Sequence, residues 1–138
     1  MRPLDELVKE LHENKPDILI APPSILRYLV DKKITLRFRK IVSTAEVLTP
    51  LDKSLIEEYF QCIVHQLYSS TEGEIATTCE FGTLHLNEDI MVIQKEYVDK
   101  EKGQFFPIIS DFKRITQPII RYRLNDILAV SYTHLTLP

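Results

Sequence analysis

The first half of the chain alternates amphipathic segments with short, continuous apolar runs. Apolar residues at helical spacing predict a surface helix from Leu4 to Leu11 and a shorter helical segment over 25–29. Thr49 can cap a helix whose first position is Pro50, so a further helix is predicted over Pro50–Phe60. The apolar runs are too short for helices and are typical of strands buried on both faces of a parallel sheet. They cover residues 17–21, 40–43 and 63–68.

The pattern changes after Gly73, where short strand candidates are separated by polar turns. These candidates cover residues 83–86, 91–94, 105–109 and 119–124, with the spacing of an antiparallel section. The basic stretch from Lys32 to Lys40 is interpreted as a solvated connection. We therefore expect an α/β fold in which a parallel sheet with flanking helices is followed by a smaller antiparallel β section.

Composition narrows the possible partners of this α/β chain. Its 138 residues carry 17 basic and 20 acidic side chains, for a net charge of −3, and the basic residues are scattered. This distribution argues against nucleic acid and against an anionic membrane surface as partners. The three glycines are too far apart for a phosphate loop. The two cysteines lack a secretory context, so we expect a cytoplasmic protein with reduced thiols.

The candidate ligand-binding residues are those directly after the predicted strands, because ligands of open α/β sheets bind at the carboxyl ends of the strands. Three segments stand there: Ser43–Glu46, Tyr68–Glu72 and Arg121–Asp126. The middle segment combines an aromatic ring, hydroxyls and a carboxylate, which could stack a base, bind a phosphate and hold Mg²⁺. The alternative is a polar helix N-cap, which local sequence alone favours.

The three segments together resemble motifs of the adenylate-forming (acyl-activating) superfamily. Tyr68–Glu72 resembles its Tyr-Gly-x-Thr/Ser-Glu motif, Ser43–Glu46 its Gly-Gly-Glu adenine loop, and Arg121–Asp126 its Arg-Tyr-Arg-Thr-Gly-Asp strand end. Residues Thr78–Asp89 are similar to the phenylacetate–CoA ligase branch of this superfamily. The resemblance extends over Asp17–Leu128, with the motifs in the family's order.

The resemblance implies a site for ATP. Tyr68 would stack on adenine, and the loop from Ser43 to Glu46 would line the same base through backbone groups around Ala45 and Glu46. Ser69 occupies the position of the family's glycine after the tyrosine; it is an expected nucleotide-binding residue and also borders the pocket for the acid substrate.

The phosphate and ribose contacts are implied in the same way. Thr71 would hydrogen-bond the α-phosphate, Glu72 would help to coordinate Mg²⁺, and Asp126 would accept hydrogen bonds from the ribose hydroxyls. Thr71 and Glu72 are therefore the expected catalytic residues. Asn125, in place of the last motif's glycine, is a mild change because asparagine tolerates a left-handed backbone.

The implied activity is ATP-dependent activation of a carboxylic acid. The acid's carboxylate attacks the α-phosphorus of ATP, giving an acyl-adenylate and pyrophosphate, and the acyl group then passes to CoA or another acceptor. Such a transfer needs cations and oriented donors more than a nucleophilic side chain. The alternative is a non-catalytic nucleotide- or zinc-binding α/β module.

Cys79 and His85 are a separate candidate metal site. They lie on either side of Gly82 and could supply half of a Cys/His zinc site. The alternatives are a small buried cysteine and a strand histidine that faces solvent or a carboxylate.

The resemblance also suggests where the domain lies. Residues 1–129 are expected to be a fragment of the large ATP- and substrate-binding domain of an adenylate-forming enzyme. Family members carry an upstream ATP loop and a downstream small domain with a lysine, so the fragment alone is expected to be inactive. Residues 130–138 are expected to be a non-native tail, because Ser131–Pro138 resembles a translated sequencing adapter.

Overall fold

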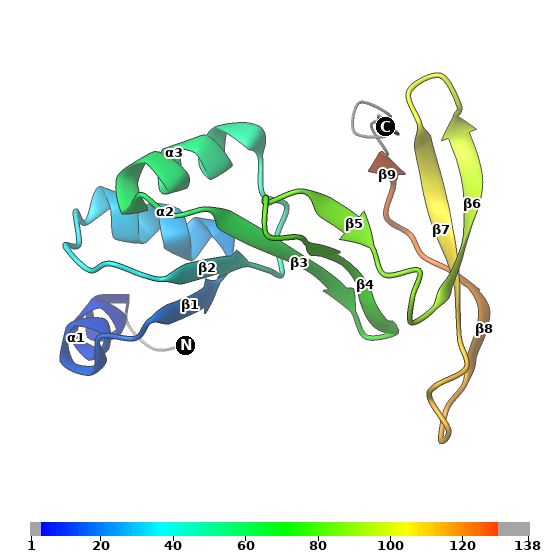
Figure 1. The fold of residues 1–138 in the computed structure, drawn as a ribbon, viewed down its shortest axis with the longest axis horizontal. Helices are drawn as coiled ribbons and strands as arrows, with labels where there is room; N and C mark the ends of the chain where they lie inside the picture. The colour runs from blue at the N-terminus through cyan, green and yellow to red at the C-terminus, as the bar shows by residue number, and fades with distance from the viewer. Residues whose placement is uncertain (1–3, 130–138) are drawn as a thin grey trace. The chain divides into compact units, whose positions relative to one another are not determined.

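The computed structural model describes residues 4–129, which fall into two compact units with their boundary between His85 and Leu86. The expected non-native tail at residues 130–138 lies outside the described residues. The expected α/β fold is confirmed, since a sheet that begins with parallel strands is followed by a smaller antiparallel sheet (Figure 1).

Unit 1 contains three helices and a five-stranded sheet of order β1-β2-β3-β4-β5. The first three strands run parallel, and β4 pairs antiparallel with β3. The helices are α1 (Leu4–Asn14), α2 (Pro23–Asp31) and α3 (Pro50–Phe60). The strands are β1 (Ile18–Ala21), β2 (Lys40–Ser43), β3 (Val64–Ser70), β4 (Gly73–Thr78) and β5 (Leu84–Leu86).

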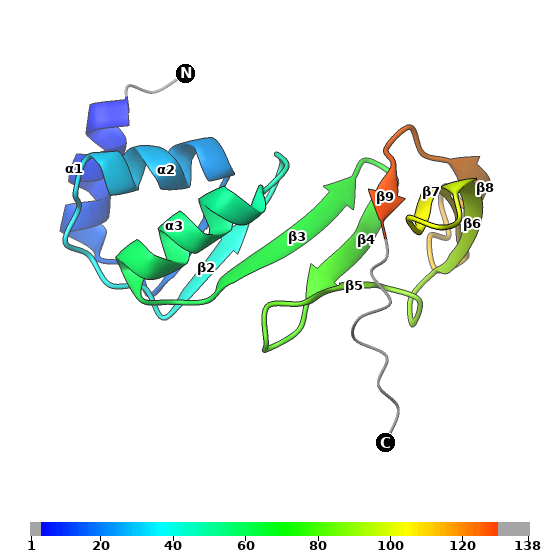
Figure 2. The ribbon, with the colours of Figure 1, turned by 90° about the horizontal axis from the view of Figure 1, so that it is seen from above.

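The core of unit 1 lies between the parallel strands and two helices. Figures 1 and 2 show α2 and α3 side by side over one face of β1, β2 and β3. The strands turn alternate residues toward this face, and Leu19, Ile41 and Val64 stand in register there and are buried. They pack in one cluster with buried helix residues such as Leu26 and Ile56. Burial of this apolar surface is the main stabilising contribution to the unit.

The connection between α2 and β2 differs from the expected solvated segment. Ile34 and Phe38 are both buried and belong to the core cluster. The ring of Phe38 meets Phe60 edge-on, with ring centroids 5.3 Å apart. The alternation of apolar and basic residues in this stretch therefore reflects an irregular segment with one face packed against the core.

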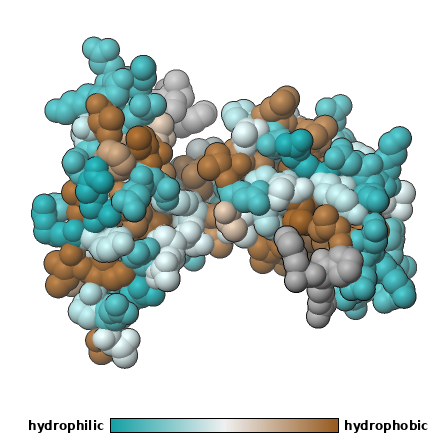
Figure 3. Space-filling model, turned by 180° about the vertical axis from the view of Figure 1, so that it is seen from behind, coloured by the Kyte–Doolittle hydropathy of each residue, from teal (hydrophilic) through white to brown (hydrophobic). Residues whose placement is uncertain are grey.

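The other face of the parallel strands carries apolar side chains that the helices do not cover. Ile18 and Ile20 point away from the core on alternate positions of β1 and are exposed, whereas Leu19 between them is buried. Figure 3 shows that apolar side chains reach the surface of both units. Among the described residues, none of the helices combines the length and apolarity that a membrane crossing requires.

Unit 2 is a four-stranded antiparallel sheet of order β6-β7-β8, with β9 also paired to β7. Its centre is β7, on which Phe105, Pro107 and Ile109 are buried at alternate positions. This alternation is typical of a strand with one face against a core. The strands are β6 (Val92–Asp99), β7 (Gln104–Asp111), β8 (Ile119–Arg123) and β9 (Leu128–Ala129).

Candidate functional site

The carboxyl ends of the parallel strands meet at one edge of the unit 1 sheet. β2 ends at Ser43, which stands opposite Gln66 of β3. β3 continues past this edge to Ser70, so Tyr68 lies two residues beyond the last pairing with β2. The adenine-loop and tyrosine segments predicted from the sequence therefore leave neighbouring strands at the same edge.

The loop after β2 is held by contacts on both of its sides. Ser43 is only 2% exposed, and its Oγ has no hydrogen-bond partner among the described residues. The Ser43 hydroxyl thus lies inside the protein. Ala45 adopts a left-handed backbone with φ of 68°, and the carboxylate of Glu46 accepts hydrogen bonds from Ser24.

The tyrosine segment forms a β-hairpin. Thr71 and Glu72 are the turn between β3 and β4, and the backbone N–H of Glu72 donates to Ser70 Oγ over 3.3 Å. The alternative interpretation as a helix N-cap is wrong, because the chain after Gly73 returns along β3 as a strand. Tyr68 is half-buried and pairs with Ala76.

A β-bulge interrupts this hairpin next to Tyr68. Tyr68 stands opposite Ala76 and Ser69 opposite Glu74, so Ile75 is an extra residue on β4. Ile75 and Ala76 are consecutive in the sequence and both are buried. Ser69, which replaces the family's glycine, is exposed at the point where the register shifts.

The structure brings the two candidate zinc ligands together at the turn before β5. Hydrogen bonds from backbone groups of Thr83 and Phe81, followed by the nearby His85, lower the pKa of the Cys79 thiol. The turn is closed by a hydrogen bond from the N–H of Gly82 to the carbonyl of Cys79. Zinc sites take three or four protein ligands, and no group of three metal-ligating side chains occurs in residues 4–129. Zinc binding by this pair stays a prediction.

Two residues with roles near this edge were missed by the sequence reasoning. Thr78 Oγ1 lies 3.1 Å from Nδ1 of His65 and accepts a hydrogen bond from the N–H of Gln66, which ties β3 to β4. Burial, followed by the charge of Lys40, lowers the pKa of His65. The second missed residue is Ser24. The sequence feature that could have identified it is a hydroxyl in the first turn of a helix that directly follows a strand.

Unit 2 holds the remaining predicted residue, Asp126, in the exposed loop between β8 and β9. The two arginines before it, on β8, reach across β7 to side chains of β6. Arg121 donates to Gln94 over 2.8 Å, and Arg123 donates to Glu96 over 2.6 Å. The Arg123 guanidinium also lies 3.7 Å from the ring centroid of Phe106. These contacts fix the strand that leads to Asp126.

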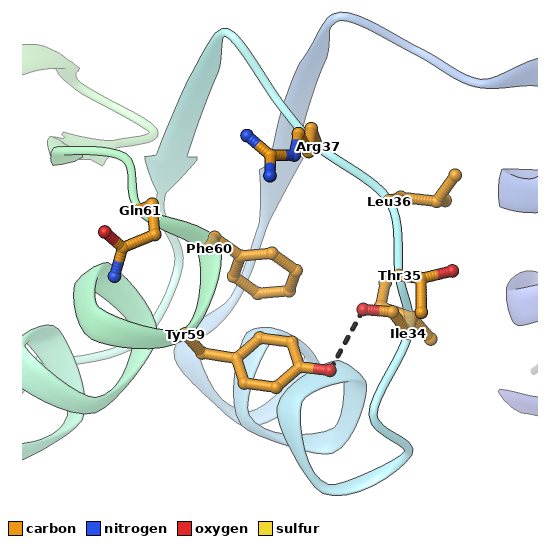
Figure 4. A pocket seen from close by; sticks show the side chains of 7 residues that line it. All are labelled: Ile34, Thr35, Leu36, Arg37, Tyr59, Phe60 and Gln61. Atoms are coloured by element: carbon orange, nitrogen blue, oxygen red, sulfur yellow. Dashed lines mark hydrogen bonds between the residues drawn. The ribbon is translucent and has the colours of Figure 1, made fainter.

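A shallow cavity of about 290 Å³ lies at the opposite edge of the unit 1 sheet. It is lined by residues 34–37 and by Tyr59, Phe60 and Gln61, and the Tyr59 hydroxyl donates to the carbonyl of Ile34 across it (Figure 4). These segments precede β2 and β3, so the cavity lies where the strands begin. The candidate site is instead assigned to the carboxyl edge, where the polar loops gather.

One curated relative resembles the chain in sequence. Protein CapK of Staphylococcus aureus is 30% identical over 127 residues, which cover 86% of this chain and 28% of CapK. The chain therefore spans less than a third of this relative. No family model matches the chain.

Solved structures show which fold the chain has. A 2-hydroxyisobutyryl-CoA ligase, solved in an open conformation in complex with 2-HIB-AMP and CoA, superposes with a TM-score of 0.74 at 21% identity over 90% of this chain and 31% of the ligase. The coronafacic acid ligase of Pectobacterium brasiliense gives a TM-score of 0.61 at 13% identity, over 92% of this chain and 27% of that enzyme. The expected fold relationship is confirmed: the chain has the fold of a segment of the adenylate-forming CoA ligases.

Proposed function

We propose that the chain is the nucleotide-binding part of an enzyme that activates a carboxylic acid with ATP as an acyl-adenylate and passes the acyl group to CoA or another acceptor. The fold supports this proposal, since it is shared with a ligase solved with an acyl-AMP and CoA. The resemblance of Thr78–Asp89 favours the phenylacetate–CoA ligase branch. The chain spans 31% of the solved ligase, and the complete reaction is proposed for a longer protein that contains this chain.

One observation carries the proposal for the adenine. The Ser43–Glu46 loop and the segment from Tyr68 leave neighbouring strands at the carboxyl edge of one sheet. Tyr68 offers an aromatic face for stacking, and the left-handed Ala45 turns the loop so that backbone groups line the base. The buried Ser43 then shapes the loop without its hydroxyl contacting the nucleotide.

The hairpin tip suits the phosphates and a magnesium ion. Thr71 and Glu72 are adjacent and offer a hydroxyl and a carboxylate, and Mg²⁺ is commonly held by one or two carboxylates together with substrate phosphates. The oxygen donors at the tip therefore fit this ion, with Glu72 as its protein ligand. Magnesium would neutralise charge on the phosphates, while Thr71 would orient the α-phosphate. Asp126, as the ribose ligand, stays a prediction from the family motif.

The test is the affinity for ATP in the presence of MgCl₂, measured by isothermal titration calorimetry. Stacking of a base on an aromatic side chain is worth about 1–3 kcal/mol, so Tyr68→Ala is expected to raise the Kd for ATP by roughly 10-fold or more. Tyr68→Phe is the matched control, because it keeps the ring and should keep the affinity. Equal affinities of the unaltered chain and Tyr68→Ala would contradict the assignment.

A further inference from the structure

The N-terminus of α2 receives its carboxylate from another part of the chain. Its N-cap residue is Pro22, which makes no side-chain capping hydrogen bond, and its first turn contains no acidic residue. Glu46 supplies the missing group, because the N–H of Ser24 donates to its Oε2 over 3.2 Å and the Ser24 hydroxyl donates to its Oε1 over 2.9 Å. A carboxylate at this position is stabilised by the helix dipole and by charge-assisted hydrogen bonds.

The same contact fastens the loop after β2. Glu46 is 22 residues from Ser24, so the hydrogen bonds connect the β1–α2 junction to the β2–α3 loop across the edge of the sheet. The loop has two further anchors, the N–H of Thr44 bonded to the carbonyl of Ala21 and the buried side chain of Leu48. Between them Ala45 is exposed, and Val47 is 87% exposed. Without Glu46, no side chain of residues 45–47 would hold this part of the loop.

We infer that Glu46 is a positioning residue for the nucleotide: its carboxylate, bound to Ser24, holds the loop backbone in the shape that receives adenine. This inference rests on the proposed function and gives the Glu46 side chain a role distinct from contact with the ligand. Both carboxylate oxygens are engaged by Ser24, which directs the group toward the helix. Affinity then depends on preorganisation of the loop, since a mobile loop would have to be ordered on binding.

The experiment compares ATP, adenosine and inorganic triphosphate as ligands of the unaltered chain and its variants. Loss of a helix-capping group costs about 1 kcal/mol, so Glu46→Ala is expected to raise the Kd for ATP and for adenosine roughly fivefold. The Kd for triphosphate should not change, whereas general damage to the fold would weaken all three ligands. Glu46→Gln keeps an acceptor oxygen and should restore part of the affinity.

A double-mutant cycle identifies the partner. Ser24→Ala removes the hydroxyl bond, keeps the bond from the backbone N–H, and should weaken adenosine binding in part. Ser24→Ala with Glu46→Ala should bind no more weakly than Glu46→Ala alone, because Glu46→Ala already removes the bond that Ser24→Ala deletes. Glu58→Ala, on the surface of α3, is the matched control and should bind like the unaltered chain. Additive effects, or a normal Kd for Glu46→Ala, would overturn the inference.

Failure of the proposed function gives a different result. The unaltered chain would then bind neither ATP nor adenosine, and hydrogen exchange would decide the role of Glu46. Faster exchange of the residue 44–48 amides in both Glu46→Ala and Ser24→Ala would support the contact between loop and helix. Unchanged exchange of these amides would overturn it.

Discussion

Ser43 carries a hydroxyl that is buried without a hydrogen-bond partner among the described residues. Leaving a buried polar group unpaired costs roughly 1–3 kcal/mol, so Ser43→Ala is expected to raise the free energy of unfolding by about 1 kcal/mol. Urea denaturation followed by circular dichroism measures this change.

Ser110 provides the control for Ser43. It is also buried, but its Oγ accepts a hydrogen bond from the N–H of Arg121 over 2.9 Å. Ser110→Ala should therefore lower the free energy of unfolding by about 1–2 kcal/mol, since it removes a satisfied partner. If Ser43→Ala destabilised the chain as much as Ser110→Ala does, the Ser43 hydroxyl would have a partner in solution.

At the scale of elements, α3 begins at a well-defined cap. Thr49 Oγ1 accepts a hydrogen bond from the N–H of Asp52 over 3.1 Å and donates to the Asp52 carboxylate over 2.8 Å. Thr49→Ala is expected to lower the free energy of unfolding by about 1 kcal/mol. Thr49→Ser keeps the capping hydroxyl and should therefore keep most of the stability that Thr49→Ala loses. Thermal unfolding of the two variants makes the comparison, and equal midpoints for Thr49→Ala and the unaltered chain would argue against this cap.

Elements with local signals could be predicted from the sequence, and elements that depend on pairing could not. The predicted bounds of α3, Pro50–Phe60, match the structure because a cap and a first-turn proline act within one turn. β4 (Gly73–Thr78) was missed, since it buries two consecutive residues and lacks the alternation of a regular strand. Its strand conformation comes from pairing with β3.

The same distinction applies to the candidate site. Its two polar segments were predicted to follow strands, and the structure places both at one carboxyl edge. The hydrogen bonds between Ser24 and Glu46 could not be predicted, because they join residues of two different loops. The burial of Ser43 was also unforeseen, since the sequence does not show which way the last side chain of a strand points.

At the scale of the whole molecule, apolar side chains remain exposed on the helix-free face of the β1–β2–β3 sheet. Ile20 of β1 is 62% exposed there. Ile20→Thr keeps a β-branched residue and is expected to reduce aggregation measured by static light scattering, with a change in stability of no more than about 0.5 kcal/mol.

The neighbouring residue on the opposite face tests this assignment. Leu19→Ala removes a buried side chain and should cost about 2–5 kcal/mol. Similar losses of stability for Leu19→Ala and Ile20→Thr would show that both faces of β1 are covered in solution.

Because β4 carries an extra residue, the pairing of the hairpin depends on the number of residues in β4 more than on their identity. Side chains of a strand change sides at every step, and Ile75 delays that change by one position. A regular ladder of the same length would instead pair Ser69 with Ile75 and Ser70 with Glu74, which would turn Glu74 to the other side of the sheet. A homologue that pairs regularly here would therefore keep Thr71 and Glu72 as a two-residue tip only if its second strand were one residue shorter.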